Sequence, residues 1–190
     1  MRSFKIMAGV LAVAVAFVAP LPGSPAQAVG PVQAAAVDWP IQEMERLDPL
    51  EGVWNCTGLN YSRPGATPIA ATGSAAVKFS QGQRWLQWDV KTTLANGYVG
   101  TEFAVWGWDA VTKTYSLDTY GEGYRAILRS PGWQGNTIKA YGITTTASAD
   151  IVRSRVSMTI EGSDAVSLQR EYEVDGAFYV AVQQACRRSS

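Results

Sequence analysis

Apolar and polar residues alternate along most of the chain from residue 52 onward. Stretches rich in β-branched and aromatic residues follow a period of two and are separated by short turn segments, a pattern typical of antiparallel strands. Because open sheet edges promote aggregation, a meander of about 8–10 strands is expected to close on itself. The sequence therefore predicts an all-β fold, an antiparallel up-and-down barrel. The predicted strands lie near 52–60, 73–80, 83–93, 98–108, 114–120, 124–130, 136–142, 151–161, 164–174 and 177–187.

One short amphipathic helix is expected before the first strand. Pro40 suits a first helical turn, and Ile41, Met44 and Leu47 recur at helical spacing. The helix should end near Pro49, because the residue before a proline avoids the helical conformation. The sequence thus predicts a helix over residues 40–50, leading directly into the barrel.

The N-terminal residues have the order of a secretory signal peptide. Arg2 and Lys5 precede an apolar run over 6–18, and small residues surround Ala28. The run is shorter than the ~20 residues of a membrane-spanning helix, so we expect cleavage after Ala28 and no membrane span. The chain is therefore expected to be exported, to the periplasm or the extracellular space. Its predicted organisation is a signal peptide over 1–28, a flexible leader over 29–38 and a barrel domain over 39–190.

The alternation also assigns side chains to the two faces of the barrel wall. Small residues at inward positions, such as Ala75 and Ala140, leave room and favour a ligand-sized cavity over a filled core. Trp106 and Trp108 fall on the opposite, outward face, as do most acidic residues, Glu102 among them. The residues predicted to point inward are Leu86, Trp88, Val90, Val99, Phe103, Val105, Val152, Val156, Met158, Ile160, Val166, Leu168, Tyr172, Val174, Phe178, Val180, Val182 and Cys186.

The cysteine and histidine content limits which catalytic and metal-binding functions the chain can have. Cys56 and Cys186 are the only cysteines, and in an exported protein an even pair predicts a disulfide, with two separate buried thiols as the alternative. The chain has no histidine, so it lacks the commonest general base and the commonest metal ligand. We expect no catalytic residue, metal or cofactor. With 16 basic and 16 acidic residues, the composition also gives no reason to expect nucleic-acid binding.

Short motifs resemble a known family. The run from Leu50 to Trp54, directly after the helix, resembles the Gly-x-Trp signature of lipocalins and their calycin relatives. The longer run 47–58 and the segments 108–115 and 132–135 resemble secreted bacterial lipocalin-like proteins. The resemblance implies that Trp54 closes one end of the barrel and that an arginine of the last strand, Arg187 or Arg188, packs over its ring. Nitrobindin-type relatives bind haem through a histidine, so haem binding is not carried over.

Arg170 stands out among the inward positions of the predicted strands. It lies between Leu168 and Tyr172, and an unpaired buried guanidinium is costly. We expect an internal salt bridge or a different strand register, and the functional hypothesis is that Arg170 meets an anionic group such as a ligand carboxylate. The candidate ligand-lining residues are Trp88, Phe103, Tyr124, Met158, Arg170 and Tyr172.

These patterns favour a non-catalytic protein that binds a small apolar or amphipathic molecule inside a lipocalin-like barrel. The main alternative is an envelope or extracellular interaction module with a filled barrel, whose exposed Trp106 and Trp108 contact a protein partner. A histidine-free calycin enzyme is a third possibility. It would need an inward acid with a raised pKa, and the pattern shows no clear one.

Overall fold

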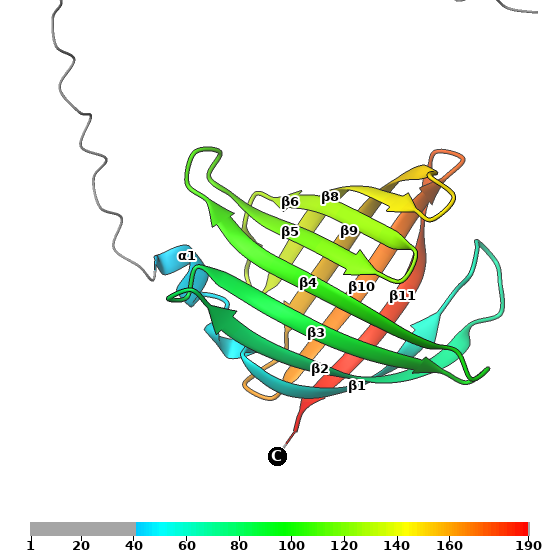
Figure 1. Ribbon diagram of the computed structural model, residues 1–190, viewed down its shortest axis with the longest axis horizontal. Helices are drawn as coiled ribbons and strands as arrows, with labels where there is room; N and C mark the ends of the chain where they lie inside the picture. The colour runs from blue at the N-terminus through cyan, green and yellow to red at the C-terminus, as the bar shows by residue number, and fades with distance from the viewer. Residues whose placement is uncertain (1–40, 190) are drawn as a thin grey trace, which may run out of the picture. The chain divides into compact units, whose positions relative to one another are not determined.

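The chain folds into a closed antiparallel barrel in a computed structural model that describes residues 41–189 (Figure 1). Strands adjacent in sequence pair with one another, and β1 pairs with β11 to join the two ends of the sheet. β6 pairs with β8, while the two-residue β7 only extends the edge of β8. Ten strands therefore form the up-and-down ring, which confirms the predicted fold class.

The strand bounds follow the predicted alternation closely. The strands are β1 (Gly52–Asn60), β2 (Ile69–Ser80), β3 (Trp85–Leu94), β4 (Val99–Asp109), β5 (Thr114–Gly121), β6 (Tyr124–Ser130), β7 (Trp133–Gln134), β8 (Thr137–Thr146), β9 (Ile151–Ile160), β10 (Ala165–Val174) and β11 (Ala177–Arg188). β2 starts four residues earlier and β8 ends four residues later than predicted, because Gly73 and Gly142 interrupt the apolar pattern inside those strands.

The helix before the barrel is shorter than predicted. α1 spans only Gln42–Glu45 and is followed by a single 3-10 turn, Asp48–Leu50, that contains Pro49. Met44, Leu47 and Leu50 are fully buried, and the Tyr115 hydroxyl donates a hydrogen bond to the Glu43 carbonyl at 2.6 Å. The helix therefore covers one end of the barrel. Pro40, the predicted signal peptide and the leader lie outside the described residues, and within 41–189 no helix is long and apolar enough to cross a membrane.

The covered end of the barrel is filled by large side chains. Trp54 is buried and donates from its indole nitrogen to the Leu50 carbonyl at 2.8 Å. Around it pack the apolar residues of the helix and of nearly every strand. The other buried members of this core include Val77, Leu86, Trp106, Tyr115, Leu117, Leu128, Ile138 and Met158.

Two contacts join the first strand to the last. Cys56 lies directly opposite Cys186 on the paired strands β1 and β11, and the two form a disulfide. Two residues further on, the Arg188 guanidinium lies 4.4 Å from the centre of the Trp54 ring. It also donates hydrogen bonds to the carbonyls of Glu51, of Pro49 at 2.6 Å and of Ser163 at 3.1 Å. Arg187, the other candidate, pairs with Asn55 on the exposed side of the wall.

The predicted faces are wrong for β4. Residues directly opposite one another on neighbouring strands share a face, and Leu86 lies opposite Trp106 while Trp88 lies opposite Ala104. Trp106 therefore points inward, whereas Phe103 points outward, together with Val99 and Val105. The alternation pattern assigned this strand to the wrong faces because both its odd-numbered and its even-numbered positions carry apolar residues.

The predicted faces are also wrong for the start of β11. Arg170 lies opposite Val182, but the next residue of β10, Glu171, lies opposite Val180, so β11 contains one extra residue at this bulge. A bulge reverses the face of every residue beyond it. Phe178 and Val180 therefore lie on the outer face, and Phe178 is covered there by Arg155, whose guanidinium lies 4.3 Å from the ring centre.

Candidate functional site

The end of the barrel away from α1 is hollow. A cavity of about 230 Å³ extends inward from the β3–β4 and β5–β6 turns to Trp54 and the disulfide. Its wall is mainly apolar and comes from β1–β4, β6, β10, β11 and the β5–β6 turn. The lining residues are Trp54, Cys56, Asn60, Ala75, Trp88, Val90, Thr92, Leu94, Tyr98, Gly100, Thr101, Glu102, Glu122, Tyr124, Val166, Leu168, Arg170, Tyr172, Val182, Gln184 and Cys186.

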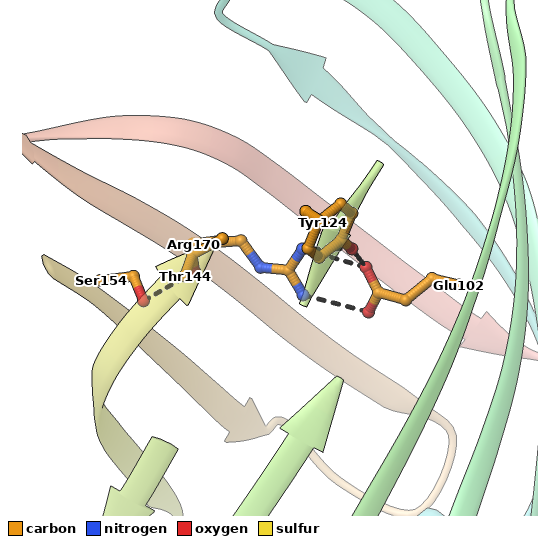
Figure 2. A network of polar contacts seen from close by, with 5 residues as sticks. All are labelled: Glu102, Tyr124, Thr144, Ser154 and Arg170. Carbon is orange, nitrogen blue, oxygen red and sulfur yellow. Dashed lines mark hydrogen bonds and ion pairs between the residues drawn. The ribbon is translucent and has the colours of Figure 1, made fainter. Parts of the chain in front are cut away.

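A polar bridge crosses the interior beside this cavity (Figure 2). Arg170 of β10 donates from Nη1 to Glu102 Oε2 at 2.9 Å and from Nη2 to Glu102 Oε1 at 3.0 Å. The Tyr124 hydroxyl accepts a further hydrogen bond from Arg170 Nη1 at 2.7 Å and itself donates to Glu102 Oε2. Both carboxylate oxygens of Glu102 and both terminal nitrogens of Arg170 are therefore engaged.

The bridge keeps Arg170 charged although it is buried. Burial alone would lower the pKa of the guanidinium, but the facing Glu102 carboxylate, together with Tyr172, raises it above its usual value. The bidentate geometry is the strong form of an arginine–carboxylate contact. Arg170 Nε and the Trp88 indole nitrogen are buried without a hydrogen-bond partner in the described part of the chain. The ion pair thus neutralises the one basic side chain that lines the cavity.

Next to the bridge, on β8 and β9, two smaller polar side chains form a hydrogen bond with each other. Thr144 of β8 donates to Ser154 of β9 at 2.9 Å, and both are buried (Figure 2). Neither residue lines the cavity, whereas Glu102, Tyr124 and Arg170 all do. The bridge therefore marks one boundary of the hollow space.

The rim carries a second acidic residue. Glu122, in the β5–β6 turn, is exposed and accepts a hydrogen bond from the Thr101 hydroxyl at 3.1 Å. Tyr98, in the β3–β4 turn, donates to the same carboxylate at 3.4 Å. These contacts connect two neighbouring turns at the mouth of the cavity. Within residues 41–189 no group of three His, Cys, Asp or Glu side chains is placed to hold a metal ion.

Comparison with known proteins identifies the family. A family model described as "Protein of unknown function (DUF1579)" matches residues 39–188, which include the whole barrel. The chain belongs to the DUF1579 family. No curated protein matches it.

Solved structures with low similarity include three proteins bound to DFHBI, two of which are described as redesigned β-barrels. EF1p2_mFAP2b is 11% identical, with a TM-score of 0.45, over 77% of this chain and 99% of that one. The redesigned barrel mFAP0 is 11% identical, with a TM-score of 0.42, over 74% and 99% of the two chains. The redesigned barrel mFAP1 is 10% identical, with a TM-score of 0.41, over 78% of this chain and 100% of that one.

The DUF1579 barrel places most of the predicted lining residues at the cavity. Trp88, Tyr124, Arg170 and Tyr172 all line it. Met158 is buried and points inward, but it lies opposite Ile138 and Leu168 in the apolar core and not among the lining residues. Phe103 does not line the cavity either, because β4 turns it to the outer face.

Arg170 meets an internal partner, which agrees with the internal salt bridge that the sequence left open and not with a free ligand carboxylate. The partner is Glu102, which the sequence pattern had assigned to solvent. The wrong face for β4 hid this pair, since the same inversion that turns Phe103 outward turns Glu102 inward. The signal that could have found it is the rule that a buried guanidinium requires an acid on a facing strand.

The predicted exposed tryptophan patch is absent from the described surface. Trp106 is only 3% exposed because it packs in the core opposite Leu86 and Leu117. Trp108 packs against that core, with its ring edge-on to Tyr115 at 5.0 Å between ring centres. Neither side chain is placed to form the partner-binding surface that the alternative function required.

Proposed function

We propose that this protein binds a small, largely apolar molecule in the hollow end of the barrel and does not transform it. The observation that carries the proposal is the cavity of about 230 Å³ between an apolar wall and the Arg170–Glu102 bridge. Apolar cavities of about 150 Å³ can take up benzene from water. A space of this size therefore suits a body of one or two rings, stabilised by removal of its apolar surface from water.

We further propose that the protein is lipocalin-like and exported, and two contacts between the first and last strands support this. The arginine over the tryptophan ring, Arg188 on Trp54, is the arrangement that the Gly52-Val53-Trp54 motif implies for lipocalins. The disulfide between Cys56 and Cys186 suits an oxidising compartment such as the periplasm or the extracellular space.

The lining carboxylates support binding rather than catalysis. Glu102 accepts hydrogen bonds from Arg170 on both oxygens and from Tyr124 on Oε2, so its carboxylate is engaged in the bridge before any molecule binds. Glu122 lies exposed at the rim. Histidine, the commonest general base, does not occur in the sequence.

The proposal is tested with a neutral fluorescent probe, N-phenyl-1-naphthylamine, titrated into the purified protein. Its emission should rise with saturable binding. Val90→Phe fills the cavity from β3 and should abolish the rise. Thr93→Phe adds the same ring on the outer, exposed face of the same strand and is the matched control.

Thermal unfolding of both variants checks that the barrel remains folded. The proposal stands if the two variants unfold cooperatively and only Val90→Phe loses the probe. Equal binding by wild type and Val90→Phe, or no saturable binding by wild type, would refute it.

A further inference from the structure

The charges around the cavity are already balanced before any ligand enters. Among the lining residues only Arg170, Glu102 and Glu122 are ionisable acids or bases with full charge at neutral pH. Arg170 and Glu102 neutralise each other, with both terminal guanidinium nitrogens used. Glu122 then adds a negative charge at the mouth that no other lining residue neutralises. The cavity therefore offers no free cation to an acid.

The cost of removing water from a charged group should make the cavity select neutral ligands over carboxylates. Moving a carboxylate from water into a mainly apolar space is very costly unless a cation or several hydrogen-bond donors replace its water. To reach Arg170, a ligand carboxylate would have to displace Glu102 and leave this partly buried carboxylate with only Tyr124 as a partner. It would also pass the negative Glu122 at the rim. Each of these steps opposes anion binding.

The same wall holds uncharged groups that have no partner. Asn60, Thr92 and Gln184 line the cavity, and their side chains form no hydrogen bond with any other described residue. They come from β1, β3 and β11. Amide and hydroxyl groups can hydrogen-bond a neutral carbonyl, amide or hydroxyl without the burial of a charge.

We infer that the ligand is an uncharged molecule with a neutral hydrogen-bonding group, and that the Glu102–Arg170 pair excludes carboxylic acids of the same shape. This inference rests on the proposed binding function. A buried arginine at an inward position could bind the anionic group of a ligand. Here Arg170 does not, because its charge is already neutralised by Glu102.

An isosteric pair of probes tests the inference. 2-Naphthamide and 2-naphthoate share one ring system and nearly one shape, but at pH 7 only the second is charged. Each is used to displace N-phenyl-1-naphthylamine from the wild-type protein. We expect 2-naphthamide to displace the probe at a concentration at least about tenfold lower, a difference of about 1.4 kcal/mol.

Glu102→Gln assigns the selectivity to the ion pair. The variant keeps the shape and a hydrogen-bonding oxygen facing Arg170, but removes the negative charge, so 2-naphthoate should gain at least about tenfold relative to 2-naphthamide. Asp89→Asn is the control. It removes one negative charge from the exposed face of β3, next to the inward Trp88, and should leave the ratio unchanged.

The outcomes separate the two claims. If the wild type does not bind N-phenyl-1-naphthylamine, the proposed function fails. If it binds the probe but 2-naphthoate displaces it as well as 2-naphthamide does, only the present inference fails, whether or not Glu102→Gln folds. A ratio that shifts equally in Asp89→Asn and Glu102→Gln would also overturn it, because net charge and not the ion pair would then set the selectivity.

Discussion

Arg170 and Glu102 are separated by 68 residues, yet Arg170 Nη2 lies 3.0 Å from Glu102 Oε1 inside the barrel. β10 carries the arginine and β4 the glutamate, so the pair spans strands that are not neighbours in the sheet. This one contact ties opposite parts of the wall together and also sets the charge of the cavity.

Breaking that pair from one side should destabilise the fold. Arg170→Met leaves the Glu102 carboxylate with only Tyr124 as a partner, and we expect the free energy of unfolding to fall by about 2–4 kcal/mol. The double variant Arg170→Met/Glu102→Leu removes both charges and should recover most of the loss. Urea unfolding of the three proteins measures this. A single variant as stable as wild type would contradict the structural role.

Arg188 should matter much more than its neighbour Arg187. Arg188→Met removes the cation over Trp54 and the hydrogen bonds to three backbone carbonyls, so we expect a loss of about 1–3 kcal/mol. Arg187→Met alters an exposed side chain on the same strand and should change the stability by no more than about 0.5 kcal/mol. Denaturant midpoints of the two variants provide the comparison. Equal losses would mean that the Trp54 contact contributes nothing.

The orientation of β4 can be tested with two aromatic residues of opposite face. Trp106→Ala creates a cavity in the filled end and should cost about 3–5 kcal/mol. Phe103→Ala removes a ring that is already 36% exposed and should cost about 1 kcal/mol or less. The reverse order of unfolding midpoints would show that the strand faces the other way.

The outer face contains an acid whose titration should affect stability. Hydrogen bonding from Arg155 holds the pKa of Glu171 below the ordinary glutamate value of 4.5, despite an opposing effect of burial. A carboxyl whose pKa is lowered by folding stabilises the fold above its unfolded pKa and loses that contribution as the pH falls through its folded pKa. Because Arg155 is partly exposed, the contribution is expected to be about 1 kcal/mol or less.

Glu171→Gln should therefore unfold more easily than wild type at pH 7, with the difference shrinking as the pH falls below about 4.5. Glu161→Gln removes a negative charge from an exposed position just beyond β9 and is the control for the loss of net charge. Chemical unfolding from pH 7 to pH 3 measures both. A pH-independent gap for Glu171→Gln would contradict the ion pair.

The sequence predicted the ring of strands well because alternation and turn residues are local signals. Turns at Gly97, Gly123 and Gly176 each have a positive φ that favours glycine, so the sequence marks where the chain reverses. The pairing of Cys56 with Cys186 could also be predicted, because these are the only two cysteines and lie near the ends of the barrel domain.

The site was harder to predict because its faces depend on long-range register. β4 has apolar residues at both parities, and only its pairing with β3 shows that Glu102 points inward. Likewise the bulge opposite Arg170 turns Phe178 outward, although the sequence of β11 alternates on both sides of it. A local pattern cannot report a one-residue shift that is set by a neighbouring strand.

The most direct test of the central claim is a heteronuclear NMR titration of the protein with 2-naphthamide. The account predicts chemical-shift changes concentrated on residues that line the cavity, above all the Trp88 indole and the backbone of Val90 and Val182. Shifts concentrated instead on Phe103 and Tyr120 of the outer face, or no shifts at saturating ligand, would contradict it.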